Sequence, residues 1–219
     1  SNKNNDFSHD AFWKNLDKGA KDHEIIHFIG KDIVYFHAIF WPALLLAGNY
    51  ATPDMIHVNG FLTINHQKMS KSRGTFVNAR DYLDNLDPAY LRYYFAAKLS
   101  EDVHDIDLSA DDFIQRVNTD LVNKYVNIAS RSAGFIKKLF NLKLSANLSD
   151  ESLEHIKFGQ DLAPKIAQSY ENRSFSSAMR AIMQFADHAN QYIDQHQPWV
   201  LAKSEDETER AKVQEICTV

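Results

Sequence analysis

A short cationic segment, residues 68–74, carries the side chains best suited to chemistry in this sequence. It reads Lys-Met-Ser-Lys-Ser-Arg-Gly, so three cations are interspersed with two serines and a glycine follows them. Lysine ammonium groups act as mobile point charges on phosphate oxygens, while hydroxyl and backbone N–H groups add directed hydrogen bonds. A turn and a short strand are predicted before the segment, and a helical period begins after it. The pattern favours a loop that binds polyphosphate; the alternative is an ordinary solvated turn.

The residues before this segment predict the sheet that would hold it. Residues 24–30 read as a buried strand that ends at a glycine, residues 33–47 as a helix, and residues 55–58 as the next strand. A strand, a helix and a strand in this order are joined by a right-handed crossover, which implies a parallel sheet. Such sheets bind ligands at the carboxyl ends of their strands.

This rule predicts that Gly30, Lys31 and Asp32, which follow the first strand, lie near the loop after Ile64. The Asp32 carboxylate could accept hydrogen bonds from ribose hydroxyls, and Gly30 would let the backbone approach a nucleotide. Asp32 has a structural alternative, because aspartate is also a common N-cap of a helix such as the one that follows.

Three aromatic side chains, Phe36, His37 and Trp41, lie on the helix predicted for residues 33–47. Their spacing of one, four and five residues places them on one side of that helix. Such a group is often an ordinary contact between helix and sheet. It could also line a ligand pocket.

The rest of the chain has a helical period. Asp87 and Pro88 predict an N-cap and a first helical residue, and residues 101–108 read as acidic and irregular. Ser109 is the predicted N-cap, within a capping box, of a long helix that reaches Leu139. Further helices are predicted for residues 152–172, for the stretch from Ser174 to Pro198, and from Glu205 onward. We therefore predict an α/β part (residues 1–75), a connecting segment (76–99) and an all-helical part (100–219).

Composition excludes several classes of protein. The sequence has 219 residues, of which 44% are hydrophobic and 24% charged, as in ordinary globular proteins. No run of about 18 apolar residues occurs, so a transmembrane helix is not expected. Cys217 is the single cysteine, which excludes a disulfide framework and a Cys-rich zinc site within the sequence, and favours a reducing, cytoplasmic setting.

Charge is distributed unevenly along the chain, whose net charge is −5. Residues 64–98 and residues 111–144 each contain six Lys or Arg against three Asp or Glu, whereas residues 145–219 contain seven against twelve. The central third is therefore the part expected to face a polyanion.

Residues 68–72 spell the Lys-Met-Ser-Lys-Ser signature of class I aminoacyl-tRNA synthetases. The surrounding sequence resembles the methionyl-tRNA synthetases in particular. Residues 27–33 and 36–42 resemble the second half of that family's catalytic domain. Residues 127–131 and the pair Pro198-Trp199 resemble its anticodon-binding helices.

This resemblance implies the C-terminal half of a Rossmann-like catalytic domain followed by an α-helical anticodon-binding bundle. It also implies an ATP-dependent attachment of methionine to its tRNA through a methionyl-adenylate, with Mg²⁺ accompanying ATP as substrate. A lysine on the leaving pyrophosphate would stabilise the transition state more than the ground state. The implied residues are Lys71 and Lys68 for catalysis; Lys68, Ser70, Lys71, Ser72, Gly30 and Asp32 for ATP; Phe36, His37 and Trp41 for methionine; and Asn127, Arg131, Pro198 and Trp199 for a CAU anticodon.

The resemblance covers residues 28–198, and the family's first catalytic half has no counterpart here. That half holds the His-Ile-Gly-His motif, most of the methionine pocket and a Cys-bearing knuckle that binds zinc in many members. We therefore expect a C-terminal portion of such an enzyme that is inactive alone, with zinc only in the part that is absent. The alternative is a non-catalytic tRNA-binding module. Another class I synthetase is disfavoured by Trp41 and residues 127–131.

Overall fold

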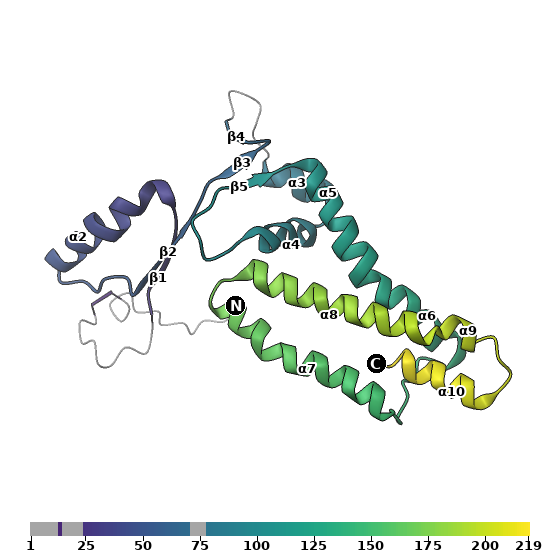
Figure 1. The fold of residues 1–219 in the computed structure, drawn as a ribbon. Coiled ribbons are helices and arrows are strands. Elements are labelled where there is room, and N and C mark those ends of the chain that lie inside the picture. The colour runs from purple at the N-terminus through teal and green to yellow at the C-terminus, as the bar shows by residue number, and fades with distance from the viewer. Residues whose placement is uncertain (1–12, 15–23, 71–77) are drawn as a thin grey trace, which may run out of the picture. The chain divides into compact units, whose positions relative to one another are not determined.

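The computed structural model describes residues 13–14, 24–70 and 78–219, which form two compact units (Figure 1). The first unit runs to Met69 and also includes Asp102–Asp107. The second consists of Ser70–Glu101 and Leu108–Val219. The fold is mixed α/β and mostly helical, and the domain boundaries inferred from the sequence stay a prediction.

The first unit contains the predicted strand, helix and strand. β1 (Ile26–Gly30) and β2 (Met55–Asn59) pair in parallel, with Ile26 opposite Met55. The helical connection between them consists of η1 (Lys31–Ile33), η2 (Phe36–Phe40) and α2 (Trp41–Ala47). This confirms the parallel pair and its helical crossover.

The middle of this connection, η2, is a π-helix rather than the expected α-helix. Pro42 follows directly in the first turn of α2 and has no N–H to donate to the carbonyl four residues earlier. The N–H of Trp41 instead donates to the carbonyl of Phe36, five residues back. A proline thus explains a local widening of the helix that apolar periodicity did not indicate.

A second, three-stranded sheet has the order β4-β3-β5. β3 (Leu62–Ile64) and β4 (Gln67–Lys68) form an antiparallel hairpin whose two-residue turn has positive φ angles, 48° at Asn65 and 61° at His66. This is the backbone that tight hairpins require. β5 (Ile106–Leu108) completes the sheet. The prediction that residues 101–108 are irregular is therefore wrong for residues 106–108. The strand was missed because three residues with an aspartate in the middle show no strand pattern.

Helices make up most of the second unit. α3 (Ala79–Asn85) and α4 (Pro88–Lys98) come first. The predicted long helix follows as α5 (Ala110–Arg116), the π-helical η4 (Val117–Val126) and α6 (Asn127–Leu139). The remaining helices are α7 (Asp150–Glu171), α8 (Phe175–His196), α9 (Pro198–Leu201) and α10 (Glu207–Ile216).

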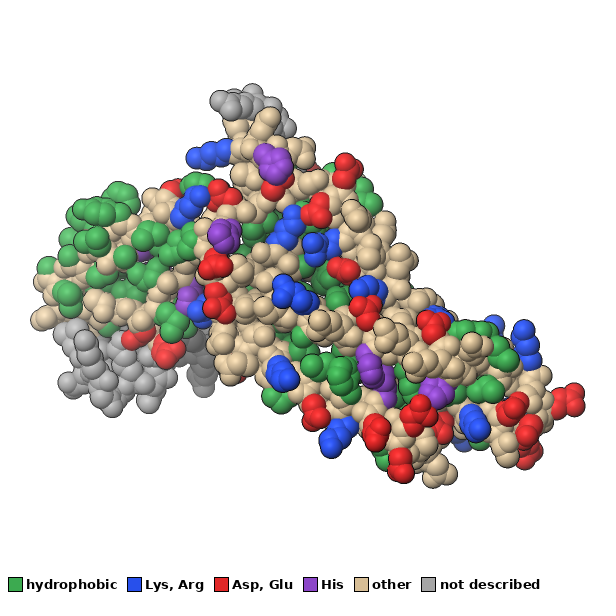
Figure 2. Space-filling view, viewed as in Figure 1, with side chains coloured by type: hydrophobic (Ala, Val, Ile, Leu, Met, Phe, Trp, Pro, Cys, Tyr) green, Lys and Arg blue, Asp and Glu red, His purple; other side chains and the backbone are tan. Residues whose placement is uncertain are grey.

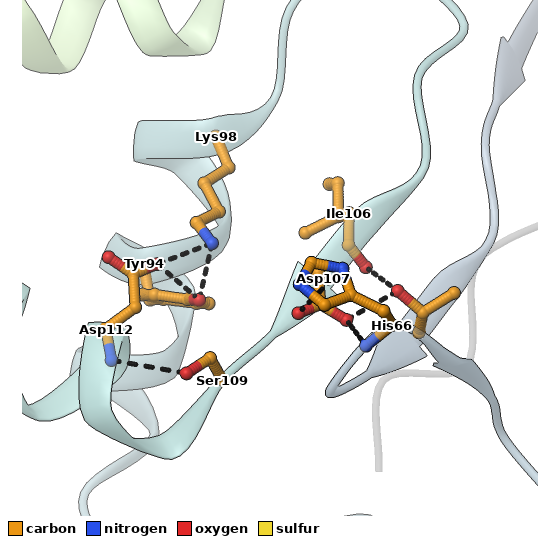
Figure 3. A network of polar contacts seen from close by, with 8 residues as sticks. His66, Tyr94, Lys98, Ile106, Asp107, Ser109 and Asp112 are labelled. Atoms are coloured by element: carbon orange, nitrogen blue, oxygen red, sulfur yellow. Dashed lines mark hydrogen bonds and ion pairs between the residues drawn. The ribbon is translucent and has the colours of Figure 1, made fainter.

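The predicted helix ends are confirmed at three positions. Asp87 caps α4 by accepting from the N–H of Ala89 at 2.8 Å. Ser109 caps α5 by accepting from the N–H of Asp112. The return half of the expected capping box is not formed, because the Asp112 carboxylate accepts from the Tyr94 hydroxyl at 2.8 Å and pairs with Lys98 (Figure 3). α8 ends before Pro198.

The core of the second unit lies along α8, which packs against α4, α6, α7 and η4. Ala178 on α8 and Tyr94 on α4 are completely buried, and Ile193 is 3% exposed. Among the described residues, none of the helices is long and apolar enough to cross a membrane.

Candidate functional site

The predicted polyphosphate segment is described only at its start, because Lys71 and Ser72 lie outside the described residues. Lys68 ends β4, and its Nζ lies 5.1 Å from the centre of the Phe61 ring. Nζ of Lys31 lies 4.7 Å from the centre of the same ring. This confirms that a residue after β1 lies near the segment that follows Ile64. The two ammonium groups form a cationic site around one aromatic side chain.

Lys31 is held by a carboxylate from a distant part of the sequence. Its Nζ donates to Oδ1 of Asp105 at 2.7 Å, and the N–H of Phe61 donates to the same oxygen at 2.7 Å. The Lys31 ammonium group, followed by the Phe61 N–H, lowers the pKa of the Asp105 carboxyl. Sequence reasoning missed Phe61 and Asp105, since nothing local indicates that they meet.

The hairpin that carries Lys68 is held by a second aspartate, Asp107, which lies two residues after Asp105 (Figure 3). Oδ1 of Asp107 accepts from Oγ1 of Thr63 at 2.7 Å and from the N–H of His66, in the hairpin turn, at 2.6 Å. A carboxylate on β5 thereby satisfies a turn N–H that the hairpin itself leaves unpaired.

Gly30 and Asp32 lie at the end of β1 and within η1. A Cβ placed on Gly30 would lie 2.8 Å from Oδ1 of Asp32, so a side chain there would have to displace the carboxylate. The alternative role of Asp32 as a helix N-cap is wrong: Gly30 occupies the N-cap position, and no side chain caps this turn. Asp32 is exposed.

The three predicted methionine-pocket residues have different aromatic neighbours. The Phe36 ring contacts Tyr35 and Phe40, His37 contacts His27, and Trp41 contacts Trp13 with ring centres 6.5 Å apart. A cavity of about 360 Å³ is lined by Trp13, Trp41, Leu44, Leu45, Gly48 and Tyr50. The structure therefore places Trp41 at an apolar cavity that Phe36 and His37 do not line. Trp13 was not identified from the sequence.

In the second unit, three polar pairs join the long helix to α8. Each pair is separated by 63 residues. A constant separation means that the two helices run in the same direction with a fixed register. The pairs are Lys124 with Asp187 at 2.8 Å, Asn127 with Asn190 at 3.2 Å, and Arg131 with Asp194.

Two of these pairs contain predicted anticodon residues. The Asn127 amide donates to Oδ1 of Asn190, whose own amide donates to two backbone carbonyls. The Arg131 guanidinium bonds the Asp194 carboxylate and lowers its pKa. The guanidinium also lies 4.7 Å from the centre of the Trp199 ring.

Pro198 and Trp199 reach this position because the chain turns sharply after α8. Gln197 adopts a left-handed conformation with φ of 45°, and Pro198 then begins α9 and is buried. Trp199 is half-buried. Arg131 and Trp199 are thus brought together from segments 68 positions apart, as a guanidinium stacked on an indole, with Asn127 one turn earlier on the same helix.

The chain is similar to curated proteins over almost its whole length. Two curated proteins named methionine–tRNA ligase, from two strains of Francisella tularensis subsp. holarctica, are each 51% identical over 217 residues. The matched region is 99% of this chain and 31% of those relatives, so the chain spans about a third of their length.

Solved structures show the same relationship. Mycobacterium tuberculosis methionyl-tRNA synthetase bound by methionyl-adenylate superposes with a TM-score of 0.78 and 30% identity, over 88% of this chain and 38% of that one. A second structure of that enzyme with methionyl-adenylate gives 0.79 and 28%, over 93% and 42%. A family model described as tRNA synthetases class I (M) matches residues 1–133. Because that match covers more than half of the 219 residues, the chain belongs to the class I (M) family of tRNA synthetases.

Proposed function

We propose that this chain is the C-terminal part of a methionine–tRNA ligase. In this proposal the first unit is the second half of a Rossmann-like class I catalytic domain, and the second unit includes the helical anticodon-binding domain. The observation that carries the proposal is the convergence of Lys31 and Lys68 on Phe61, directly before the remainder of the Lys-Met-Ser-Lys-Ser signature. The names of the matched relatives support it.

The proposed reaction requires charge stabilisation rather than a general base. The carboxylate of methionine attacks the α-phosphorus of ATP, the bond to the β-phosphate oxygen breaks, and pyrophosphate leaves. Negative charge accumulates on that leaving group, where Lys68 and Lys71 would stabilise it. Ser70 and Ser72 would add hydrogen bonds to the phosphates, while Asp32 would accept from the ribose beside Gly30. Mg²⁺ would enter as part of the ATP substrate.

Methionine recognition would use the aromatic side of η2 and α2. Trp41 lines an apolar cavity, and a thioether gains favourable contacts from such rings. Phe36 and His37 would complete the pocket together with a part of the enzyme that this chain does not contain. Phe36 is 56% exposed here, which leaves its ring accessible for that role.

Anticodon recognition would use Trp199 as a stacking surface, with Pro198 directing the chain. RNA loops are commonly read by stacking of unpaired bases on aromatic rings. The Asn127 amide and the Arg131 guanidinium are planar hydrogen-bonding groups within the same face of α6. By family resemblance the triplet read is CAU. The intact core of the second unit also supports the alternative, in which this chain alone acts as a tRNA-binding module.

A variant of the complete ligase tests the catalytic part. Lys71→Ala should slow methionyl-adenylate formation by roughly 10²–10³-fold, the usual cost of losing one positioned charge stabiliser. Its affinity for methionine should be unchanged. Rapid measurement of adenylate formation and equilibrium binding of methionine separate the two quantities. A variant that activates methionine normally but binds it weakly would contradict the assignment.

A further inference from the structure

One carboxylate in the first unit comes from a segment far in sequence from Lys31, Phe61 and Lys68, which form the rest of the cationic site. Residues 102–107 belong to this unit although a long helical stretch separates them from it in sequence. Asp105 in this segment contacts Lys31, 74 residues earlier, at 2.7 Å. The side chains are 42% and 37% exposed, respectively, so the pair is open to solvent and to a ligand.

The position of Asp105 is set by the main chain and does not depend on Lys31. The N–H of Phe61 donates to its Oδ1, and the N–H of Ile106 donates back to the carbonyl of Phe61 at 2.8 Å. The two backbones approach so closely that a Cβ on Gly60 would lie 2.1 Å from the carbonyl oxygen of His104. Only glycine permits this contact. The backbone that carries the Asp105 carboxylate is therefore held against Gly60 and Phe61.

Lys31 is flexible by nature, and two contacts restrict it. Its ammonium group donates to Asp105 and lies against the Phe61 ring, which Lys68 also contacts. An ammonium group has three donors, so the bond to Asp105 leaves two directions for a ligand. We propose that Asp105 is a positioning residue that holds the Lys31 ammonium group beside Lys68, so that both face the phosphates of a bound nucleotide.

This inference rests on the proposed nucleotide site. The charge of Asp105 alone would have the opposite effect on ATP binding. A carboxylate repels a polyphosphate, so removing its charge without other effects would tighten ATP binding. If the carboxylate instead positions Lys31, removing it releases the ammonium group and weakens binding. The direction of the change therefore distinguishes a positioning residue from a bystander.

The experiment measures Mg²⁺–ATP binding to the complete ligase by calorimetry, without methionine. Asp105→Asn keeps an acceptor for the Phe61 N–H but leaves Lys31 only a weaker, uncharged acceptor, and should weaken ATP binding about tenfold, the scale of one hydrogen bond to a charged group. Asp102→Asn is the matched control: it removes the same charge three residues away, from a side chain that is 75% exposed and faces His104. This control should bind ATP as tightly as the wild type, or slightly more tightly.

A second variant, Lys31→Met, tests the proposal even if Asp105→Asn disturbs folding. Lys31→Met leaves both backbone contacts of the Asp105 segment in place and should weaken ATP binding by about the same factor. In the Lys31→Met background, Asp105→Asn should cause no further loss of ATP binding, because the loss acts through Lys31. Equal or tighter binding by Asp105→Asn, or an undiminished loss in the Lys31→Met background, would overturn the proposal.

The outcomes also separate this inference from the proposed function. If ATP binding shows the predicted pattern but the wild-type ligase gives no methionine-dependent exchange of pyrophosphate into ATP, the function is wrong and the positioning role stands. If exchange is normal and Asp105→Asn binds ATP like the wild type, the positioning role is wrong and the function stands.

Discussion

α8 in the second unit is surrounded by four helical elements, whereas η2 and α2 in the first unit expose most of their apolar side chains. Among the described residues, the first unit buries three apolar side chains, those of Ile29, Leu45 and Ala51. Figure 2 shows the hydrophobic side chains gathered over α2. Exposed residues on β1 and along the helical connection to β2 include Phe28, Tyr35, Phe36, Ile39, Phe40, Leu44 and Leu46.

This difference indicates that the two units relate differently to the rest of the protein. Contiguous apolar surface on a globular protein usually marks a place where another surface packs. The second unit has its own core, and side chains cap the N-termini of α3, α4, α5, α7 and α10, so we expect it to fold by itself. The first unit has a polar, cationic end whose contacts are well defined, and an apolar face that its described residues leave exposed.

The largest expected effect concerns activity. The isolated chain should show no methionine-dependent exchange of pyrophosphate into ATP, because the proposed nucleotide site has only its cationic end in a chain that spans about a third of its relatives. The measurement is the incorporation of labelled pyrophosphate by the purified chain. The control is the chain with Lys71→Ala, and exchange above that background would show that the first unit is catalytically complete.

The next effect compares the cores of the two units. Ile193→Ala should destabilise the second unit by about 2–5 kcal/mol, because Ile193 is 3% exposed and truncation leaves a cavity. Leu44→Ala on α2, where the side chain is 50% exposed, should change the free energy of unfolding by less than about 1 kcal/mol. Denaturant unfolding of both variants of the isolated chain provides the comparison. Similar losses at the two sites would contradict the difference between the units.

The smallest effect is a pH dependence confined to the second unit. His155 on α7 is 7% exposed and stacks on His188 and Tyr192 of α8. Burial, together with the charges of His188 and His196, lowers its pKa in the folded state. The unfolded chain therefore binds the proton more readily, and stability should be complete above about pH 6.5 and fall as the pH decreases toward the lowered pKa.

Thermal unfolding of the isolated chain between pH 7.5 and 5 measures this dependence. His155→Phe keeps an aromatic ring in the stack and should flatten the dependence, whereas the exposed His104→Gln in the first unit should leave it unchanged. A steeper loss of stability in His155→Phe than in the wild type would show that other groups control the acid response.

The sequence predicted the features that depend on neighbouring residues. Asp87 with Pro88, Ser109, and Pro198 marked helix ends correctly, because caps and proline act within a few positions. Gly30 correctly marked the end of a strand in a parallel pair. The π-helical stretch before Pro42 was missed because apolar periodicity cannot distinguish 3.6 residues per turn from a wider turn.

The features that were missed depend on residues far apart in sequence. β5 pairs with β3 across more than 40 positions, and Asp105 reaches Lys31 across 74. The partners of Asn127 and Arg131 on α8 were also not predicted, because they lie 63 positions away. Local patterns therefore located the candidate residues, while the contacts that orient them required the structure.

In the proposed function, the second unit recognises the anticodon of a methionine tRNA. The most direct test is equilibrium binding of a CAU anticodon stem-loop, and of one with a changed anticodon, by the isolated chain and by Trp199→Ala. We predict that the wild-type chain prefers CAU and that Trp199→Ala loses about 1–3 kcal/mol of CAU binding, the value of one base stacked on an aromatic ring. Unchanged CAU binding by a folded Trp199→Ala variant would show that Trp199 only packs against Arg131, and would contradict the proposed function.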